Sequence, residues 1–206
     1  MTPLSAVYLS LDGDAICPSN AELAARLSVP RRQIPSAVPA LVSRISAEAS
    51  PAAVFAYAER SDELAALLSL DRVPSLSGDR VALLAVTLGF GVDRLLEREK
   101  RRGIADAYLL DAVASAMAEA AADAVDRAIR AEYPSVVFGR RFSPGYGSLP
   151  LSVNTPLLSL LDADKRLGIR QSESLLLHPT KTITAILGGT HENESHKAPD
   201  IGAPLF

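Results

Sequence analysis

A short loop in the second half of the sequence gathers residues that are suited to binding a ligand. It reads Arg-Phe-Ser-Pro-Gly-Tyr-Gly over residues 141–147. Pro144 has a fixed φ and favours an extended Ser143, whereas Gly145 and Gly147 can adopt backbone angles that other residues avoid. Such a loop allows a ligand to approach the main chain closely.

Two side chains of this loop add specific chemistry. Arg141 carries a planar, permanently charged guanidinium, which can bind a carboxylate through two parallel hydrogen bonds. Tyr146 offers a ring face on which another ring or a positively charged sulfur can pack. On its own, the segment is more simply explained as an ordinary Pro-Gly turn with one solvated arginine. The residues around it must decide between these interpretations.

The segments that flank the loop occur in an order that is similar to a known family. Downstream lie residues 156–162 (PLLSLLD), 167–169 (LGI), 172–174 (SES), 178–179 (HP) and 182–188 (TITAILG), and upstream lie 84–89 (LAVTLG) and 111–119 (DAVASAMAE). This order and spacing resembles the activation (reactivation) domain of cobalamin-dependent methionine synthase, and in particular the short free-standing relatives of that domain. The resemblance covers roughly residues 81–188.

The resemblance implies a binding site for S-adenosylmethionine. In the family, an Arg-x-x-Pro-Gly-Tyr segment binds this methyl donor, and the residues that match its site are Arg141, Ser143, Pro144, Gly145, Tyr146, Gly147 and Glu119. Arg141 would hold the ligand carboxylate and Glu119 its ammonium group, while the loop backbone would bond the adenine. Without the resemblance, Glu119 is explained equally well as an ordinary surface glutamate.

The resemblance also implies the reaction and the partners. In the family, a reduced cobalamin held by a partner domain takes the methyl group of S-adenosylmethionine, so the domain positions the donor and supplies no catalytic residue or metal ligand. The implied partners are the cobalamin-binding domain of methionine synthase or another corrinoid protein, and an electron donor such as a flavodoxin or ferredoxin. We therefore expect a reactivation protein of methionine biosynthesis that supports reductive methylation of cob(II)alamin on a separate methionine synthase chain.

Other functions are compatible with the same residues. One alternative is a non-catalytic docking module for a corrinoid protein, and another is a reactivator of a different corrinoid methyltransferase. Whether the chain counts as an enzyme in its own right stays open.

Two departures from the family bear on the choice among these functions. The aromatic-rich segment that follows the last strand in long methionine synthases is replaced here by Gly188-Gly189 and polar residues, and the family's acidic contact near the start has only Asp12 and Asp14 as candidates.

The hydrophobic pattern supplies the elements that must position the loop. Alternating or continuous apolar runs predict strands at 53–58, 80–87, 136–138, 175–177 and 182–186, while residues 6–9 are a short apolar segment. Apolar spacing, capping residues and proline positions predict helices at 21–27, 34–45, 92–102, 106–132 and 157–161. Residues 63–70 are ambiguous between helix and strand. The predicted fold class is α+β: a twisted, mainly antiparallel sheet with helices packed on it, one of them long and rich in alanine.

Three portions of the chain are distinguished. Residues 1–78 are expected to form an N-terminal portion of the same domain, residues 79–189 the core that carries the ligand loop, and residues 190–206 a polar tail that we expect to be disordered.

Composition and charge exclude several classes of function. The chain has 206 residues, of which 48% are hydrophobic, and a net charge of −3, which argues against a nucleic-acid partner. Its single cysteine, Cys17, excludes an internal disulfide framework and fits a reducing cytoplasm. No signal peptide or membrane-spanning run is apparent. We therefore expect a cytoplasmic protein with no membrane partner.

Overall fold

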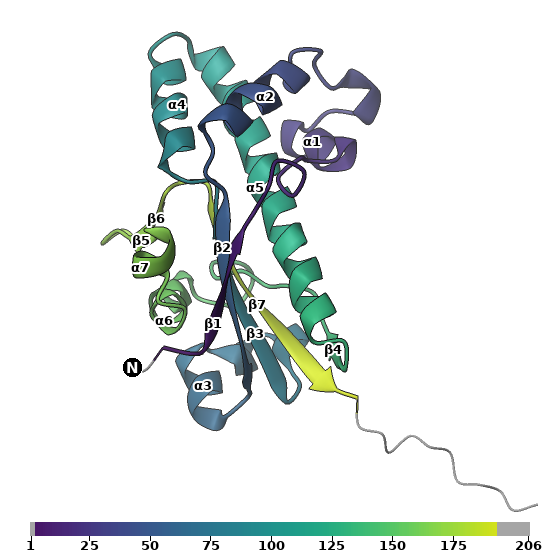
Figure 1. The fold of residues 1–206 in the computed structure, drawn as a ribbon, viewed down its shortest axis with the longest axis vertical. Helices are drawn as coiled ribbons and strands as arrows, with labels where there is room; N and C mark the ends of the chain where they lie inside the picture. The colour runs from purple at the N-terminus through teal and green to yellow at the C-terminus, as the bar shows by residue number, and fades with distance from the viewer. Residues whose placement is uncertain (1–2, 193–206) are drawn as a thin grey trace, which may run out of the picture.

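An antiparallel sheet of five strands forms the centre of the computed structural model, which describes residues 3–192 (Figure 1). The strand order is β1-β2-β3-β7-β4, and every neighbouring pair is antiparallel. The bounds are Ala6–Ser10 for β1, Ala52–Glu59 for β2, Arg80–Thr87 for β3, Val136–Phe138 for β4 and Thr182–His191 for β7. A second, two-stranded sheet pairs β5 (Arg170–Gln171) with β6 (Leu177–His178).

Helices cover both faces of the large sheet. They are α1 (Asn20–Leu27), α2 (Val38–Glu48), α3 (Asp62–Leu67), α4 (Phe90–Lys100), α5 (Ile104–Glu132), α6 (Asn154–Leu160) and α7 (Ala163–Leu167), with four 3₁₀ turns, η1 (Arg31–Gln33), η2 (Leu70–Arg72), η3 (Pro74–Leu76) and η4 (Leu151–Val153). Figure 1 shows α5 running past the sheet from α4 and α2 to β4. The predicted α+β class with an antiparallel sheet is confirmed.

Two hydrophobic cores lie on opposite faces of the central strand. Alternate residues of β3 contribute to each: Ala82, Leu84 and Val86 pack with α1, α2, α4 and α5, whereas Val81, Leu83 and Ala85 pack with α3, α6 and α7. Because side chains alternate between the two faces of a strand, burial of both faces requires a continuous apolar run. This explains why residues 80–87 were predictable to the residue.

Local capping signals fix the ends of the shorter helices. Ser19 and Glu22 form a capping box at the start of α1. The Ser61 hydroxyl accepts from the backbone N–H of Leu64, and the ambiguous stretch 63–70 accordingly begins as α3. The helix predicted from residue 34 starts only at Val38, after η1 and a turn, with Pro39 in its first turn, where a missing N–H costs nothing.

Two further predictions, at the end of the chain, are wrong. Leu175 has a φ of +64° in a turn closed by its N–H to the Ser172 carbonyl, so the triplet 175–177 is not a strand and β6 starts at Leu177. The tail expected from residue 190 overlaps β7, because Thr190 and His191 pair with Val137 and Val136 of β4. The remainder of that predicted tail, 193–206, lies outside the described residues.

Strands from before and after residue 78 belong to one sheet. β2 precedes this position and pairs along its whole length with β3, which follows it. Within residues 3–192, no helix combines the length and the apolar character that a membrane crossing requires.

Candidate functional site

A pocket of about 390 Å³ lies where the predicted loop, α5 and the first half of β7 meet. Its volume falls within the range of small-molecule sites, roughly 300–1,000 Å³. The walls come from distant parts of the chain: Arg26 of α1, Ser115, Ala118 and Glu119 of α5, Ser143, Pro144 and Tyr146 of the loop, Leu151 and Asn154, residues 175–178, and residues 180–184. We call this cavity the loop pocket.

Buried polar side chains line the loop pocket. Asn154, Lys181 and Thr184 are 2%, 9% and 4% exposed, and they account for most of the buried polar residues of the described chain. The Thr184 hydroxyl donates to Asn154 Oδ1 at 2.5 Å. Because unpaired polar groups are costly to bury, such a concentration beside a cavity is typical of a binding site.

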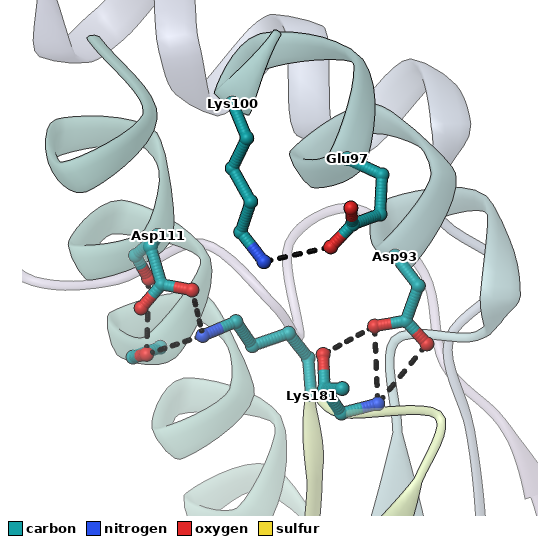
Figure 2. A network of polar contacts seen from close by, with 7 residues as sticks. Asp93, Glu97, Lys100, Asp111 and Lys181 are labelled. Carbon is teal, nitrogen blue, oxygen red and sulfur yellow. Dashed lines mark hydrogen bonds and ion pairs between the residues drawn. The ribbon is translucent and has the colours of Figure 1, made fainter. Parts of the chain in front are cut away.

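Lys181 joins the start of β7 to α5. Its Nζ donates to Asp111 Oδ1 and to Ser115 Oγ, both at 2.9 Å, and its side chain is only 10% exposed (Figure 2). These two bonds orient the lysine across the pocket wall. They also compensate part of the cost of burying its charge.

A second set of hydrogen bonds fixes Thr180, the residue before Lys181. The Thr180 backbone N–H donates to both carboxylate oxygens of Asp93 in α4, at 3.1 and 3.0 Å, and the Thr180 hydroxyl bonds the same carboxylate. Figure 2 shows Asp93 beside the exposed pair of Lys100 and Glu97, where the hydrogen bond from Lys100 lowers the pKa of Glu97. The pocket wall before β7 is thus tied to α4 as well as α5.

The predicted loop residues divide into two groups. Ser143, Pro144 and Tyr146 border the loop pocket, and the Tyr146 ring is 65% exposed at its rim. Gly145 and Gly147 do not border it. They have φ values of +92° and +50°, and an added Cβ would meet Leu151 at 3.1 Å and Phe142 at 3.2 Å. The glycines therefore shape the turn that presents the other three residues.

Arg141 lies behind Glu119. Its Nη2 donates to Glu119 Oε2 at 2.9 Å and to Asp123 Oδ1 at 2.7 Å, and the side chain is 18% exposed. Burial alone would lower the pKa of Arg141, but the hydrogen bonds that its guanidinium donates to Glu119 and Asp123 outweigh this effect, so the pKa lies above its ordinary value. Arg141 borders a neighbouring depression of about 730 Å³ instead of the loop pocket.

Glu119 connects the predicted loop to the N-terminal helix. One carboxylate oxygen accepts from Arg141, and the other accepts from Arg26 of α1. The structure thus brings Glu119 next to Arg141, as the sequence predicted. It adds Arg26 and Asp123, which no local pattern singled out because the bonded partners are 93 and 18 positions apart in the chain.

The acidic candidates near the start of the chain lie elsewhere. Asp12 accepts a hydrogen bond from the Ala15 backbone at 2.9 Å, which is turn chemistry. Asp14 borders a separate small depression beside Cys17 and Arg127. Neither residue borders the loop pocket, so the fold does not supply the family's N-terminal acidic contact from these positions.

Fold and site together define an α+β domain that presents a charged, loop-lined pocket beside the last strand of an antiparallel sheet. Residues 59–203 of the sequence match the family described as the activation domain of vitamin B12-dependent methionine synthase, and the chain belongs to this family. The resemblance seen in the sequence is confirmed. The match starts earlier than residue 81 and crosses the boundary that was drawn at residue 78.

The fold is similar to that of a solved relative. A crystal structure of the MetH reactivation domain bound to AdoHcy superposes with a TM-score of 0.68 and 17% sequence identity, over 93% of this chain and 80% of that one. At this identity the likeness establishes a shared fold. No curated protein matches the sequence.

Proposed function

We propose that this activation domain binds S-adenosylmethionine in the loop pocket and supports the reductive methylation of cob(II)alamin carried by a separate methionine synthase chain. The observation that carries the proposal is the convergence of the Ser143–Tyr146 loop and Glu119 on one cavity of suitable size. Membership of the activation-domain family supports it. So does the solved MetH reactivation domain, whose ligand AdoHcy is S-adenosylmethionine without its methyl group.

The pocket chemistry suits the parts of this ligand. Glu119 offers carboxylate oxygens that can accept from an ammonium group in addition to their present partners, since each oxygen has two lone pairs. The exposed ring of Tyr146 can cover the adenine or the sulfonium, and the backbone of Ser143–Gly147 can bond the adenine edge. Arg141 would contribute by fixing Glu119.

The chemical step needs positioning more than acid–base catalysis. A donor such as a flavodoxin or ferredoxin first reduces the partner's cob(II)alamin by one electron. The reduced cobalamin then takes the methyl group of S-adenosylmethionine, and the bond between that methyl group and the sulfur breaks, which leaves AdoHcy. The residues of this chain orient the methyl donor and shield it from water. We accordingly assign no general base, nucleophile or metal ligand among them.

One mixing experiment tests the proposal. This protein, the candidate methionine synthase of the same cell, a reductant and S-adenosylmethionine are combined, and the visible spectrum is followed from cob(II)alamin to methylcobalamin. Omission of this protein should slow the conversion sharply. Cys17→Ser, at an exposed position outside the loop pocket, should not.

The negative outcomes distinguish the alternatives. Equal rates with and without this protein would exclude that partner and favour another corrinoid methyltransferase. Calorimetry that detects no S-adenosylmethionine binding, even with the partner present, would instead favour a non-catalytic docking module.

A further inference from the structure

We propose that β1 is an interface at which a second copy of this chain adds its own β1, so that two five-stranded sheets join into one. The loop pocket and its ligand play no part in this contact. The two edges of the sheet, β1 and β4, differ in how their outward backbone groups are bonded.

The β4 edge is closed by a side chain. β4 has only three residues, and Arg130 of α5 donates from Nη1 to the Phe138 carbonyl at 2.7 Å and from Nη2 to the Gly139 carbonyl at 2.6 Å. A short edge strand whose carbonyls are already bonded offers little for another strand to pair with.

The β1 edge has no such protection. Its five residues, Ala-Val-Tyr-Leu-Ser, include no charge and no proline, and they pair with β2 residue by residue without a bulge. The side chains of Val7 and Tyr8 are 43% and 51% exposed. Figure 1 shows β1 in front of β2 with no helix across it. Because edge strands usually carry a charge, a proline or a bulge that prevents further pairing, this edge is suited to receive a strand.

The register identifies the backbone groups that face outward. The Leu11 N–H donates to the Pro51 carbonyl at 3.2 Å, which continues the pairing of β1 with β2. Because alternate residues of an edge strand bond its neighbour, the even-numbered residues of β1 direct their N–H and C=O groups to the open edge. These are Ala6, Tyr8 and Ser10, whose outward groups have no partner within residues 3–192.

The sequence of β1 fits a second copy of itself. Antiparallel pairing about a twofold axis at Tyr8 sets this residue opposite Tyr8 of the second copy, Ala6 opposite Ser10, and Val7 opposite Leu9. Each residue then meets one of similar size, and no like charges face each other. The outward residues all fall in hydrogen-bonded pairs, which gives roughly six backbone hydrogen bonds. This near-palindrome favours the second copy over a strand of another sequence.

The contact leaves the loop pocket free for other partners. β2 and β3 separate β1 from β7, whose first residues border the pocket. A dimer joined through β1 therefore carries two loop pockets, and two strands lie between each pocket and the junction of the sheets.

The test measures the dissociation constant of the dimer by analytical ultracentrifugation of the wild type, Tyr8→Lys and Tyr8→Glu. The wild type should form a dimer. Each variant should raise the dissociation constant about 10-fold or more, because like charges then face each other across the axis. An equal mixture of the two variants should restore the dimer, since opposite charges then meet. Tyr108→Lys is the matched control, a tyrosine of α5 that is 69% exposed, and should have no effect.

Disulfide cross-linking tests the register in a Cys17→Ser background. Tyr8→Cys should link two copies on mild oxidation, because the Cα atoms of a hydrogen-bonded pair lie about 5.5 Å apart. Ser10→Cys should not, because its two copies would lie roughly 14 Å apart. The proposal is overturned by a wild type that stays monomeric, by a dimer that survives Tyr8→Lys, by a mixture that stays monomeric, or by preferential cross-linking at Ser10.

Discussion

The two halves of β7 are built for different tasks. Residues 182–184 border the loop pocket, and the Thr184 hydroxyl donates a buried hydrogen bond to Asn154. Residues 188–191 carry two glycines and lie against backbone and aromatic side chains. The first half of β7 therefore supplies polar side chains to the pocket, and the second half permits close packing against its neighbours. Substitutions should consequently separate ligand binding from stability along a single strand.

The packing half leaves no room for side chains. An added Cβ on Gly188 would lie 2.6 Å from the backbone of Leu76 and 2.7 Å from the Ser77 carbonyl oxygen. On Gly189 it would meet side-chain atoms of Val136 and Phe138 at 2.7 and 2.8 Å. Because backbone atoms cannot rotate away as side chains can, Gly188 is the more restrictive of the two positions.

The largest effect is therefore expected at Gly188. Gly188→Ala should destabilise the protein by about 3 kcal/mol, the upper end of the usual cost of overpacking, and Gly189→Ala by less. Chemical denaturation measures both. Gly13→Ala is the matched control, because no atom lies within 4 Å of its added Cβ. A stable Gly188→Ala protein would show that η3 can move away from β7 and would remove the distinction between the halves.

The next effect concerns the hydrogen bonds of Lys181 with Asp111 and Ser115, beside the first half of β7. Asp111→Ala leaves Lys181 nine-tenths buried with Ser115 as its partner and should cost about 1–3 kcal/mol. Lys181→Met keeps the apolar stem and leaves Asp111, whose side chain is 51% exposed, in contact with water, so it should cost less than about 1 kcal/mol. The expected order of thermal midpoints is thus Lys181→Met above Asp111→Ala. The reverse order would mean that the lysine is solvated.

The same contrast explains what the sequence could predict. The apolar runs of β3 and β7 and the alanine-rich pattern of α5 made the sheet and the long helix recognisable, because burial imposes a period on the residues. The loop was found through its unusual Pro-Gly-Tyr composition. Gly188 and Gly189, in contrast, appeared to end a strand. Their role depends on η3 and β4, which local patterns do not place.

The remaining site residues were hidden for a related reason. Arg26, Asn154 and Lys181 carry ordinary polar side chains in ordinary elements. They become functional candidates only when the sheet order brings β7 beside α5 and the loop. Burial of a polar side chain is the signal that finds Asn154 and Lys181, and burial is a property of the fold and not of the local sequence. The exposed Arg26 is found through its contact with Glu119.

The smallest effect is expected at the far end of β7, where the polar contact is exposed. The His191 backbone N–H donates to Asp79 Oδ1 at 3.1 Å, and this bond, with the nearby charge of Arg80, holds the pKa of Asp79 below its usual 3.8. A carboxylate with a lowered folded-state pKa adds stability above its unfolded pKa, and this contribution is lost as pH falls through the folded value. Asp79→Asn should therefore be slightly less stable than the wild type at pH 7.

This difference should vanish in acid, below the lowered pKa of Asp79, where the wild-type side chain is also neutral. The wild type loses other stability in the same range, because Arg98 and Lys100 lower the pKa values of Glu48 and Glu97, so the quantity to follow is the gap between the two proteins. Thermal midpoints from pH 7 to pH 2.5 measure it. A difference between the two midpoints that stays constant with pH would assign the effect to packing of the asparagine amide. If Asp79→Asn instead lowers the midpoint as much as Asp111→Ala does, polar contacts stabilise both halves of β7 alike.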